Sequence, residues 1–148
     1  MATVNIYLNF EGNCEEAFSF YAEAFGVTNV VWNRFADMPP SPEFPISEEM
    51  KQKIMHASLP ISSETLLMGS DVMPGMNPLQ KGDNFYISVG VDSREEADTL
   101  FAKLSAGGEV TMPLQDTFWG AYFGMWVDKF GIQWMINYDD AEKVQPHQ

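Results

Sequence analysis

The stretch that decides the fold is NCEEAFSFYAEAFG, residues 13–26, together with its counterpart SREEADTLFAKLSAGG, residues 93–108. In each stretch a capping residue, Asn13 or Ser93, is followed three residues later by a glutamate that can reach back to the cap. Apolar residues then recur at helical spacing, and glycine ends the pattern. We therefore expect one short amphipathic helix in each half of the chain.

Strand-like sequence surrounds both helices. Residues 4–10 alternate and are rich in β-branched and aromatic types, which indicates a strand. The further strands are expected at 27–35, 54–61, 64–70, 84–91, 109–114, 119–127 and 132–138. The order of strand, helix and three strands thus occurs twice, and the triplet Glu-Glu-Ala recurs at 15–17 and 95–97. This internal repeat predicts an α+β fold of two βαβββ modules.

The two modules are expected to form one domain over residues 1–148. They would cover about 1–70 and 83–140, joined by a linker at 71–82 that holds two prolines and two glycines. One helix covers only one face of a four-stranded sheet. We therefore expect a cupped mixed sheet with helices on the outside and a cavity for a small ligand between the modules.

The composition excludes several classes of partner. Asp and Glu number 21 against 8 Lys and Arg, so the net charge is −13, which repels nucleic acid and anionic membrane surfaces. Apolar runs are far shorter than the ~20 residues needed to span a bilayer, and no basic region precedes the first apolar stretch. With a single cysteine, Cys14, we expect a cytoplasmic protein without disulfides.

The chain resembles the vicinal oxygen chelate superfamily, which includes glyoxalase I, extradiol dioxygenases and bleomycin-resistance proteins. Within it, the chain looks most like the PhnB-like branch, whose members are often labelled demethylubiquinone methyltransferase-like. The matching stretches are YLNFEGNCEEAFSFYAEAFG (7–26), HASLPI (56–61), LLMGSDVMP (66–74) and DTFWGAYFGMWVDKFGIQWMIN (116–137). The resemblance covers residues 5–137 and implies the double βαβββ fold and a homodimer.

The resemblance also implies where a metal ion would be held. In the superfamily, His, Glu or Gln side chains project into the cavity from the first and last strands of each module. The corresponding positions here are Ile6 (or Tyr7), Met68 (or Leu67), Tyr86 and Met135. A thioether is a soft, weak donor and an aliphatic side chain donates nothing. We therefore predict no metal, no cofactor and an apolar cavity floor.

The candidate ligand-binding residues are His56, Met68, Tyr86, Phe118, Trp119 and Met135. His56 is interpreted either as an acid–base or ligand-orienting group or, with more weight, as a hydrogen-bonded strand residue. Phe118 and Trp119 line the cavity or belong to the core with equal weight, whereas Trp126 and Trp134 are assigned to the core. No catalytic residue is identified.

Two further residue groups are interpreted as structural. Cys14 lies at a helix start, where the dipole lowers a thiol pKa, but without a nearby base it is expected to be inert. Asp128-Lys129-Phe130-Gly131 predicts a turn with an unusual backbone angle at Gly131.

The preferred function is a metal-independent small-molecule binding protein of the glyoxalase/bleomycin-resistance type. The alternative is a metal-dependent lyase, isomerase or dioxygenase of the same superfamily.

Overall fold

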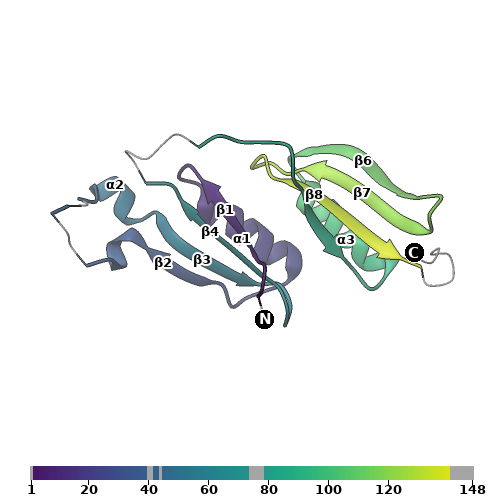
Figure 1. Ribbon diagram of the computed structural model, residues 1–148, viewed down its shortest axis with the longest axis horizontal. Helices are drawn as coiled ribbons and strands as arrows, with labels where there is room; N and C mark the ends of the chain where they lie inside the picture. The colour runs from purple at the N-terminus through teal and green to yellow at the C-terminus, as the bar shows by residue number, and fades with distance from the viewer. Residues whose placement is uncertain (1, 40–41, 44, 74–78, 141–148) are drawn as a thin grey trace. The chain divides into compact units, whose positions relative to one another are not determined.

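The chain divides into two compact units, Met1–Lys81 and Gly82–Gln148, which we describe separately. The computed structural model describes residues 2–39, 42–43, 45–73 and 79–140 (Figure 1). Within the described residues, no helix is both long and apolar enough to cross a membrane.

The first unit is a four-stranded sheet with one long helix. Its elements are β1 (Ile6–Phe10), α1 (Cys14–Phe25), β2 (Val31–Arg34), the 3₁₀ helix η1 (Phe35–Asp37), α2 (Glu48–Lys51), β3 (Ile54–Pro60) and β4 (Leu66–Asp71). The strand order is β1-β4-β3-β2. β1 runs parallel to β4, and the other neighbours are antiparallel.

The second unit repeats this topology. Its elements are β5 (Ile87–Gly90), α3 (Arg94–Ser105), β6 (Glu109–Asp116), β7 (Ala121–Val127) and β8 (Gln133–Asp139). The strand order is β5-β8-β7-β6, with β5 parallel to β8 and the rest antiparallel. The predicted α+β fold of two βαβββ modules is confirmed, and each module forms its own mixed sheet.

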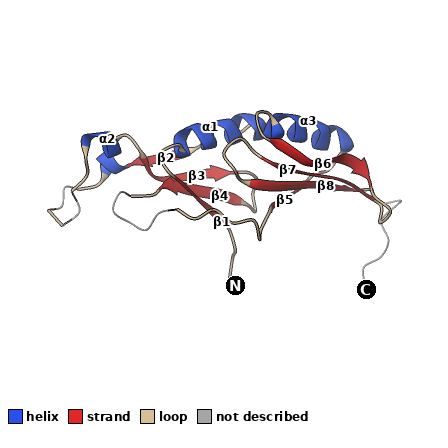
Figure 2. Cartoon of the chain, turned by 90° about the horizontal axis from the view of Figure 1, so that it is seen from above, coloured by secondary structure: helices blue, strands red, loops and turns tan. Residues whose placement is uncertain are grey.

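Each long helix packs on one face of its own sheet (Figure 2). In the first unit, Phe18 of α1 lies so close to Gly69 of β4 that an added Cβ would be 2.6 Å from the ring. In the second unit, Phe101 of α3 lies over Gly124 of β7, where an added Cβ would be 2.9 Å from the ring. A glycine therefore makes room for a helical phenylalanine in both cores.

Two tryptophans form the centre of the second core. The rings of Trp126 and Trp134 are stacked with centroids 6.0 Å apart and planes 2° apart. Their exposed fractions are 0% and 1%, and Phe101 of α3 meets Trp126 edge-on at 5.2 Å. The assignment of both tryptophans to the core is confirmed.

The turn between β7 and β8 is organised by Asp128. One oxygen, Oδ1, accepts hydrogen bonds from the amides of Phe130 and Ile132 at 2.8 and 3.0 Å. The other, Oδ2, accepts one from Trp134 Nε1 at 2.9 Å. Gly131 has φ +87°, as the turn prediction required. A buried carboxylate thus joins the turn to the aromatic core.

The predicted cap of α1 is wrong. The Asn13 side chain makes no capping hydrogen bond; instead Asp71, at the end of β4, accepts from the amides of Gly12 and Cys14 through Oδ1, both at 2.9 Å. Asp71 Oδ2 also accepts from the amide of Ile54 at 2.9 Å. The parallel pairing of β1 with β4 sets Phe10 beside Asp71 and so brings this carboxylate to the helix start.

The cap of α3 is confirmed. Ser93 Oγ accepts a hydrogen bond from the amide of Glu96 at 3.0 Å. The Glu96 carboxylate reaches back to the amide of Asp92 at 2.9 Å, one residue before the cap. The two capping side chains and the amides that they accept from lie within residues 92–96, so this cap could be predicted from the sequence alone.

Most strand boundaries differ from the predicted ones by one to four residues. β2 begins at Val31 instead of 27, because the amide of Val27 still closes α1 by donating to the Ala22 carbonyl. β5 begins at Ile87 instead of 84. Asp71 belongs to β4 and not to the predicted linker at 71–82, of which residues 74–78 lie outside the described residues.

Candidate functional site

Each sheet has a helix face and an open face, by which we mean the face that no helix of its own unit covers. Strand pairing places on the first open face Tyr7, Asn9, Val31, Asn33, His56, Ser58, Met68 and Ser70. It places on the second open face Ser88, Glu109, Met112, Phe123, Met125, Val127, Gln133, Met135 and Asn137. The six candidate residues are distributed over the two units.

The first open face brings together Tyr7, His56 and Met68. Met68 of β4 lies between Tyr7 of β1 and Ser58 of β3 in one row across the sheet. The Tyr7 hydroxyl lies 3.4 Å from His56 Nδ1, and the two ring centroids are 5.7 Å apart. His56 is therefore hydrogen-bonded, as the structural interpretation expected, but it is also on the open face, where it can meet a ligand.

The register of β1 corrects one assignment. Ile6 pairs with Leu67 and shares the helix face with the buried Leu8, so its placement in the cavity is wrong. Tyr7, given only as the alternative, is the open-face residue beside Met68. The signal was present in the sequence, because the alternation of β1 puts Ile6 on the same face as the buried Leu8 and Phe10.

Three methionines form one row on the second open face. Met125 of β7 pairs with Met112 of β6 on one side and with Met135 of β8 on the other. All three are half-buried. The next residue in the row is Ser88 of β5, which pairs with Met135. We call Met112, Met125 and Met135 the methionine row; of its members, Met135 is a predicted ligand-binding residue.

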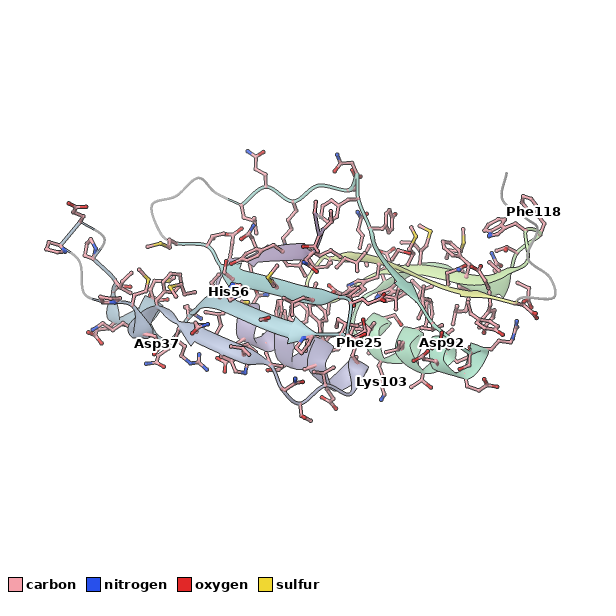
Figure 3. All side chains as sticks on the ribbon, turned by 60° about the horizontal axis from the view of Figure 1, so that its bottom comes forward. Phe25, Asp37, His56, Asp92, Lys103 and Phe118 are labelled. Carbon is pink, nitrogen blue, oxygen red and sulfur yellow. The ribbon has the colours of Figure 1, made fainter. Side chains whose placement is uncertain are left out.

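Aromatic side chains flank this row. Phe123 lies two residues before Met125 on the same face, and Trp119 meets its ring edge-on at 6.2 Å. Phe118 in turn lies 5.0 Å from Trp119. Phe118 is 91% exposed at the turn between β6 and β7 (Figure 3), and Trp119 is 44% exposed. Neither residue belongs to the core, which favours the ligand-contact interpretation.

Tyr86 lies one residue before β5 and is half-buried. The β5 residue beside Met135 is Ser88, two residues further on. This position was assigned to Tyr86, with Ser88 only as a polar alternative, because the strand was predicted to begin three residues too early. Tyr86 stays a candidate next to the row, without a contact to Met135 through strand pairing.

The donor groups do not fit the divalent metal that the resemblance implies. The open-face positions corresponding to its ligands carry the hydroxyls of Tyr7 and Ser88 and the thioethers of Met68 and Met135. Hard divalent cations prefer carboxylate and carbonyl oxygens, and imidazole suits borderline ions. Over residues 2–39, 42–43, 45–73 and 79–140, no group of three or more His, Cys, Asp or Glu is arranged to hold a metal ion.

Cys14 is buried at the start of α1. Burial in the core, followed by the neighbouring carboxylates of Asp71 and Glu15, raises the pKa of its thiol. These effects exceed the helix dipole that the sequence analysis considered. The thiol stays protonated, in agreement with the interpretation of Cys14 as inert.

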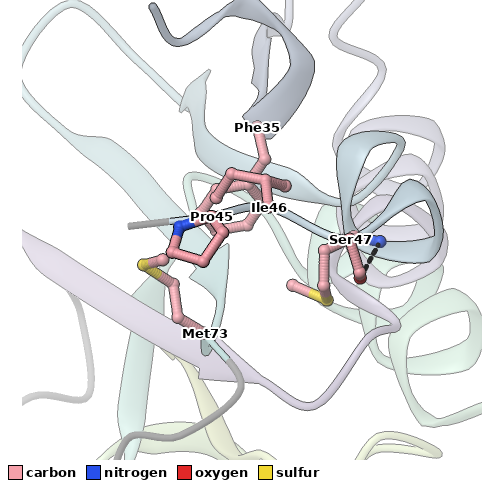
Figure 4. A pocket seen from close by; sticks show the side chains of 6 residues that line it. Phe35, Pro45, Ile46, Ser47 and Met73 are labelled. Atoms are coloured by element: carbon pink, nitrogen blue, oxygen red, sulfur yellow. Dashed lines mark hydrogen bonds between the residues drawn. The ribbon is translucent and has the colours of Figure 1, made fainter. Parts of the chain in front are cut away.

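A cleft of about 120 Å³ opens elsewhere in the first unit (Figure 4). It is lined by Phe35, Pro45, Ile46, Ser47, Met50 and Met73. Ser47 Oγ is occupied as the cap of α2, accepting from the amide of Met50 at 3.2 Å. The cleft contains none of the candidate residues and no ionisable side chain, so it offers apolar contact only.

Comparison with known proteins supports the relationship inferred from the motifs. Residues 4–136 match the model of the Glyoxalase/Bleomycin resistance protein/Dioxygenase superfamily. The protein YjdN of Escherichia coli (strain K12) is 34% identical over 148 residues, covering 96% of this chain and 97% of YjdN.

Two solved structures are similar over nearly the whole chain. Protein PA1353 from Pseudomonas aeruginosa is 41% identical with a TM-score of 0.79, covering 94% of this chain and 98% of that one. The PhnB protein from Bacillus cereus, a putative 3-demethylubiquinone-9 3-methyltransferase, is 26% identical with a TM-score of 0.72, covering 93% and 99%. This chain therefore belongs to the Glyoxalase/Bleomycin resistance protein/Dioxygenase superfamily and is similar to its PhnB-like members.

Proposed function

We propose that this chain is a metal-independent binding protein for an apolar, aromatic small molecule. The observation that carries the proposal is the second open face, where a row of half-buried methionines lies beside Phe123 and the exposed Trp119. Thioethers are polarizable and adapt to irregular shapes, and they make favourable contacts with aromatic rings. Such a face suits a flat apolar ligand better than a charged one.

The first open face, in the other unit, carries polar groups of its own. The Tyr7 hydroxyl and His56 Nδ1 are in contact, and each ring is accessible beside Met68. In this proposal the pair donates or accepts a hydrogen bond from a polar substituent of a ligand. In the second unit, Tyr86 and Phe118 are proposed as further contact residues.

The test uses a neutral aromatic probe, N-phenyl-1-naphthylamine, whose fluorescence rises in an apolar site. The Met135→Arg variant places a charge in the middle of the second open face, so we expect probe affinity to fall at least tenfold. The matched control is Thr99→Arg, which adds the same charge on the exposed side of α3. Circular dichroism checks that both variants are folded.

The expected result is loss of probe binding in Met135→Arg alone. Equal affinities in the two variants would overturn the placement of the ligand on this face. No enhancement of fluorescence with the wild-type chain at millimolar probe would overturn the proposal of an apolar binding site altogether.

Metal independence is tested separately. Protein purified without chelators or metal-affinity steps is expected to contain less than about a tenth of an equivalent of Mn, Fe, Co, Ni or Zn by elemental mass spectrometry, because functional catalytic sites usually retain their ion. A near-stoichiometric amount of one of these metals would overturn it. The metal-dependent lyase, isomerase or dioxygenase alternative would then take its place.

The proposal includes a cytoplasmic homodimer that binds neither nucleic acid nor membranes. The net charge of −13 supports the absence of nucleic-acid binding. Light scattering after size-exclusion chromatography tests the dimer: the expected mass is twice the 16.7 kDa of the chain, and the monomer mass would contradict it.

A further inference from the structure

The methionine row is unusual because its three side chains lie on adjacent strands at directly paired positions. Met125 of β7 is the Cα partner of Met112 of β6 and of Met135 of β8, and the β6–β7 register shifts on both sides of Met112. Directly opposed residues of neighbouring strands have Cβ atoms about 4.5–5.5 Å apart on the same face. Three flexible side chains can therefore direct their sulfur atoms toward the central strand.

We propose that the methionine row binds a soft monovalent cation of the copper(I) or silver(I) class. Thioethers are poor ligands for hard cations but select copper(I), a closed-shell ion that accepts low coordination numbers. Three thioethers from β6, β7 and β8 supply a complete three-coordinate set from one unit. The inference uses the same methionine row as the proposed binding function, but it requires neither an aromatic ligand nor any contact between the units.

The surroundings of the row favour a cation of low charge. Phe123 lies on the same face, two residues before Met125, and Trp119 meets its ring at 6.2 Å, so two aromatic side chains flank the row. Aromatic rings attract cations through their quadrupole. Carboxylates, which would favour a divalent ion, are absent from the row and from its neighbour Ser88.

The test is a silver(I) titration of the full chain labelled with ¹³C at the methionine methyl groups. Silver is chosen because it does not change oxidation state, and chloride is left out of the buffer. The chain has ten methionines, so ten methyl signals can be followed at once. We expect saturation at one silver ion per chain, with the signals of Met112, Met125 and Met135 moving first and together.

Substitution by leucine separates the row from other sulfur atoms. Met125→Leu removes the central ligand at nearly constant volume and should weaken silver binding at least tenfold. The matched control is Met55→Leu, a half-buried strand methionine of the first unit, which should change the affinity less than twofold. All affinities are measured in a Cys14→Ala background, so that the thiol does not contribute.

Two results would overturn the inference. One is that methyl signals outside the row move first; the other is that Met125→Leu and Met55→Leu bind silver equally well. If Met125→Leu does not fold, Met112→Leu on the edge strand β6 serves in its place. The methyl shifts of the wild-type chain then still show whether silver binds at the row or elsewhere. A chain that binds the aromatic probe but not silver overturns this inference alone.

Discussion

The two units share a topology but fix the start of their long helix by different means. In the first, the cap is Asp71, which comes from β4 and lies 57 residues from Cys14 in the sequence. In the second, the cap is Ser93, the residue directly before α3. The two units therefore have the same arrangement of helices and strands, but different interactions stabilise the start of the long helix in each.

The same junction carries an ion pair in both units, with the charges exchanged. In the first, Arg34 of the edge strand β2 makes two hydrogen bonds to Glu15 of α1, at 2.9 and 2.7 Å. In the second, Arg94 of α3 makes two to Asp116 of the edge strand β6, at 2.8 and 3.1 Å. Edge strand and helix start are thus linked in each unit, whichever partner carries the positive charge.

The open faces differ more than the cores do. The first combines Tyr7 and His56 with asparagine and serine side chains, whereas the second is built around the methionine row and Phe123. Both helix faces, by contrast, use a glycine below a phenylalanine. The two cores therefore share one packing arrangement, whereas the two open faces carry chemically different side chains.

The largest expected loss of stability follows from removing the helix caps. Asp71→Ala leaves three amides without their charged acceptor, and each such bond is worth about 1.5–3 kcal/mol, so we expect the free energy of unfolding to fall by at least about 3 kcal/mol. Ser93→Ala removes one local cap and should cost about 1 kcal/mol. Urea unfolding followed by circular dichroism measures both. Equal losses would show that the distant cap carries no more stability than the local one.

The next effect concerns the two glycines. In Gly69→Ala the new Cβ would lie 2.6 Å from the Phe18 ring and 2.8 Å from the Leu8 carbonyl oxygen, which belongs to the backbone. In Gly124→Ala its nearest neighbours would be the side chains of Phe101 and Leu114, at 2.9 and 3.2 Å. Overpacking costs about 1–3 kcal/mol, and we expect Gly69→Ala near the upper end and Gly124→Ala near the lower.

Thermal and urea unfolding of both alanine variants decide this comparison. We expect side chains to move aside more readily than backbone. A larger loss of unfolding free energy in Gly124→Ala than in Gly69→Ala would contradict this, because it would show that the second core accommodates the added methyl group less well than the first. Serine at the same positions adds a polar group and is not a suitable control. The wild-type chain and Thr99→Ala on the exposed side of α3 provide the baseline.

Features encoded by neighbouring residues were predictable from the sequence. The Ser93 cap, the left-handed glycines at 26 and 131 and the core tryptophans all depend on local pattern or on size and apolar character. These signals sufficed for the α+β fold and its repeat. Strand ends were less certain, because Val27 extends the closing turn of α1 by a single hydrogen bond.

Features that depend on strand register were harder to predict. The Asp71 cap, the contact of Tyr7 with His56 and the alignment of the methionine row each require a specific pairing between strands. A shift of one residue exchanges the two faces of a strand, which is why Ile6 was placed on the wrong side. For β5, the start at Ile87 puts Ser88, and not Tyr86, beside Met135, a difference of two residues along the strand.

The smallest expected effect is the pH dependence of the first ion pair. The hydrogen bonds from Arg34 hold the pKa of Glu15 below its ordinary value of 4.5. A carboxylate whose pKa is lowered by folding stabilises the folded state above its ordinary pKa, and this stabilisation is lost as the pH falls through the lower, folded value. Because both side chains are partly exposed, we expect no more than about 0.5 kcal/mol.

Urea unfolding of the wild type and Arg34→Gln between pH 7 and pH 3 measures this contribution. The two free energies of unfolding should differ at pH 7, with the wild type more stable, and should converge as the pH approaches 3. The difference at pH 7 should also shrink in 0.5 M salt, because exposed charges are screened. A difference that persists at pH 3 would show that Arg34 acts instead through its hydrogen bond to the Gln52 carbonyl, 2.6 Å away, which does not titrate.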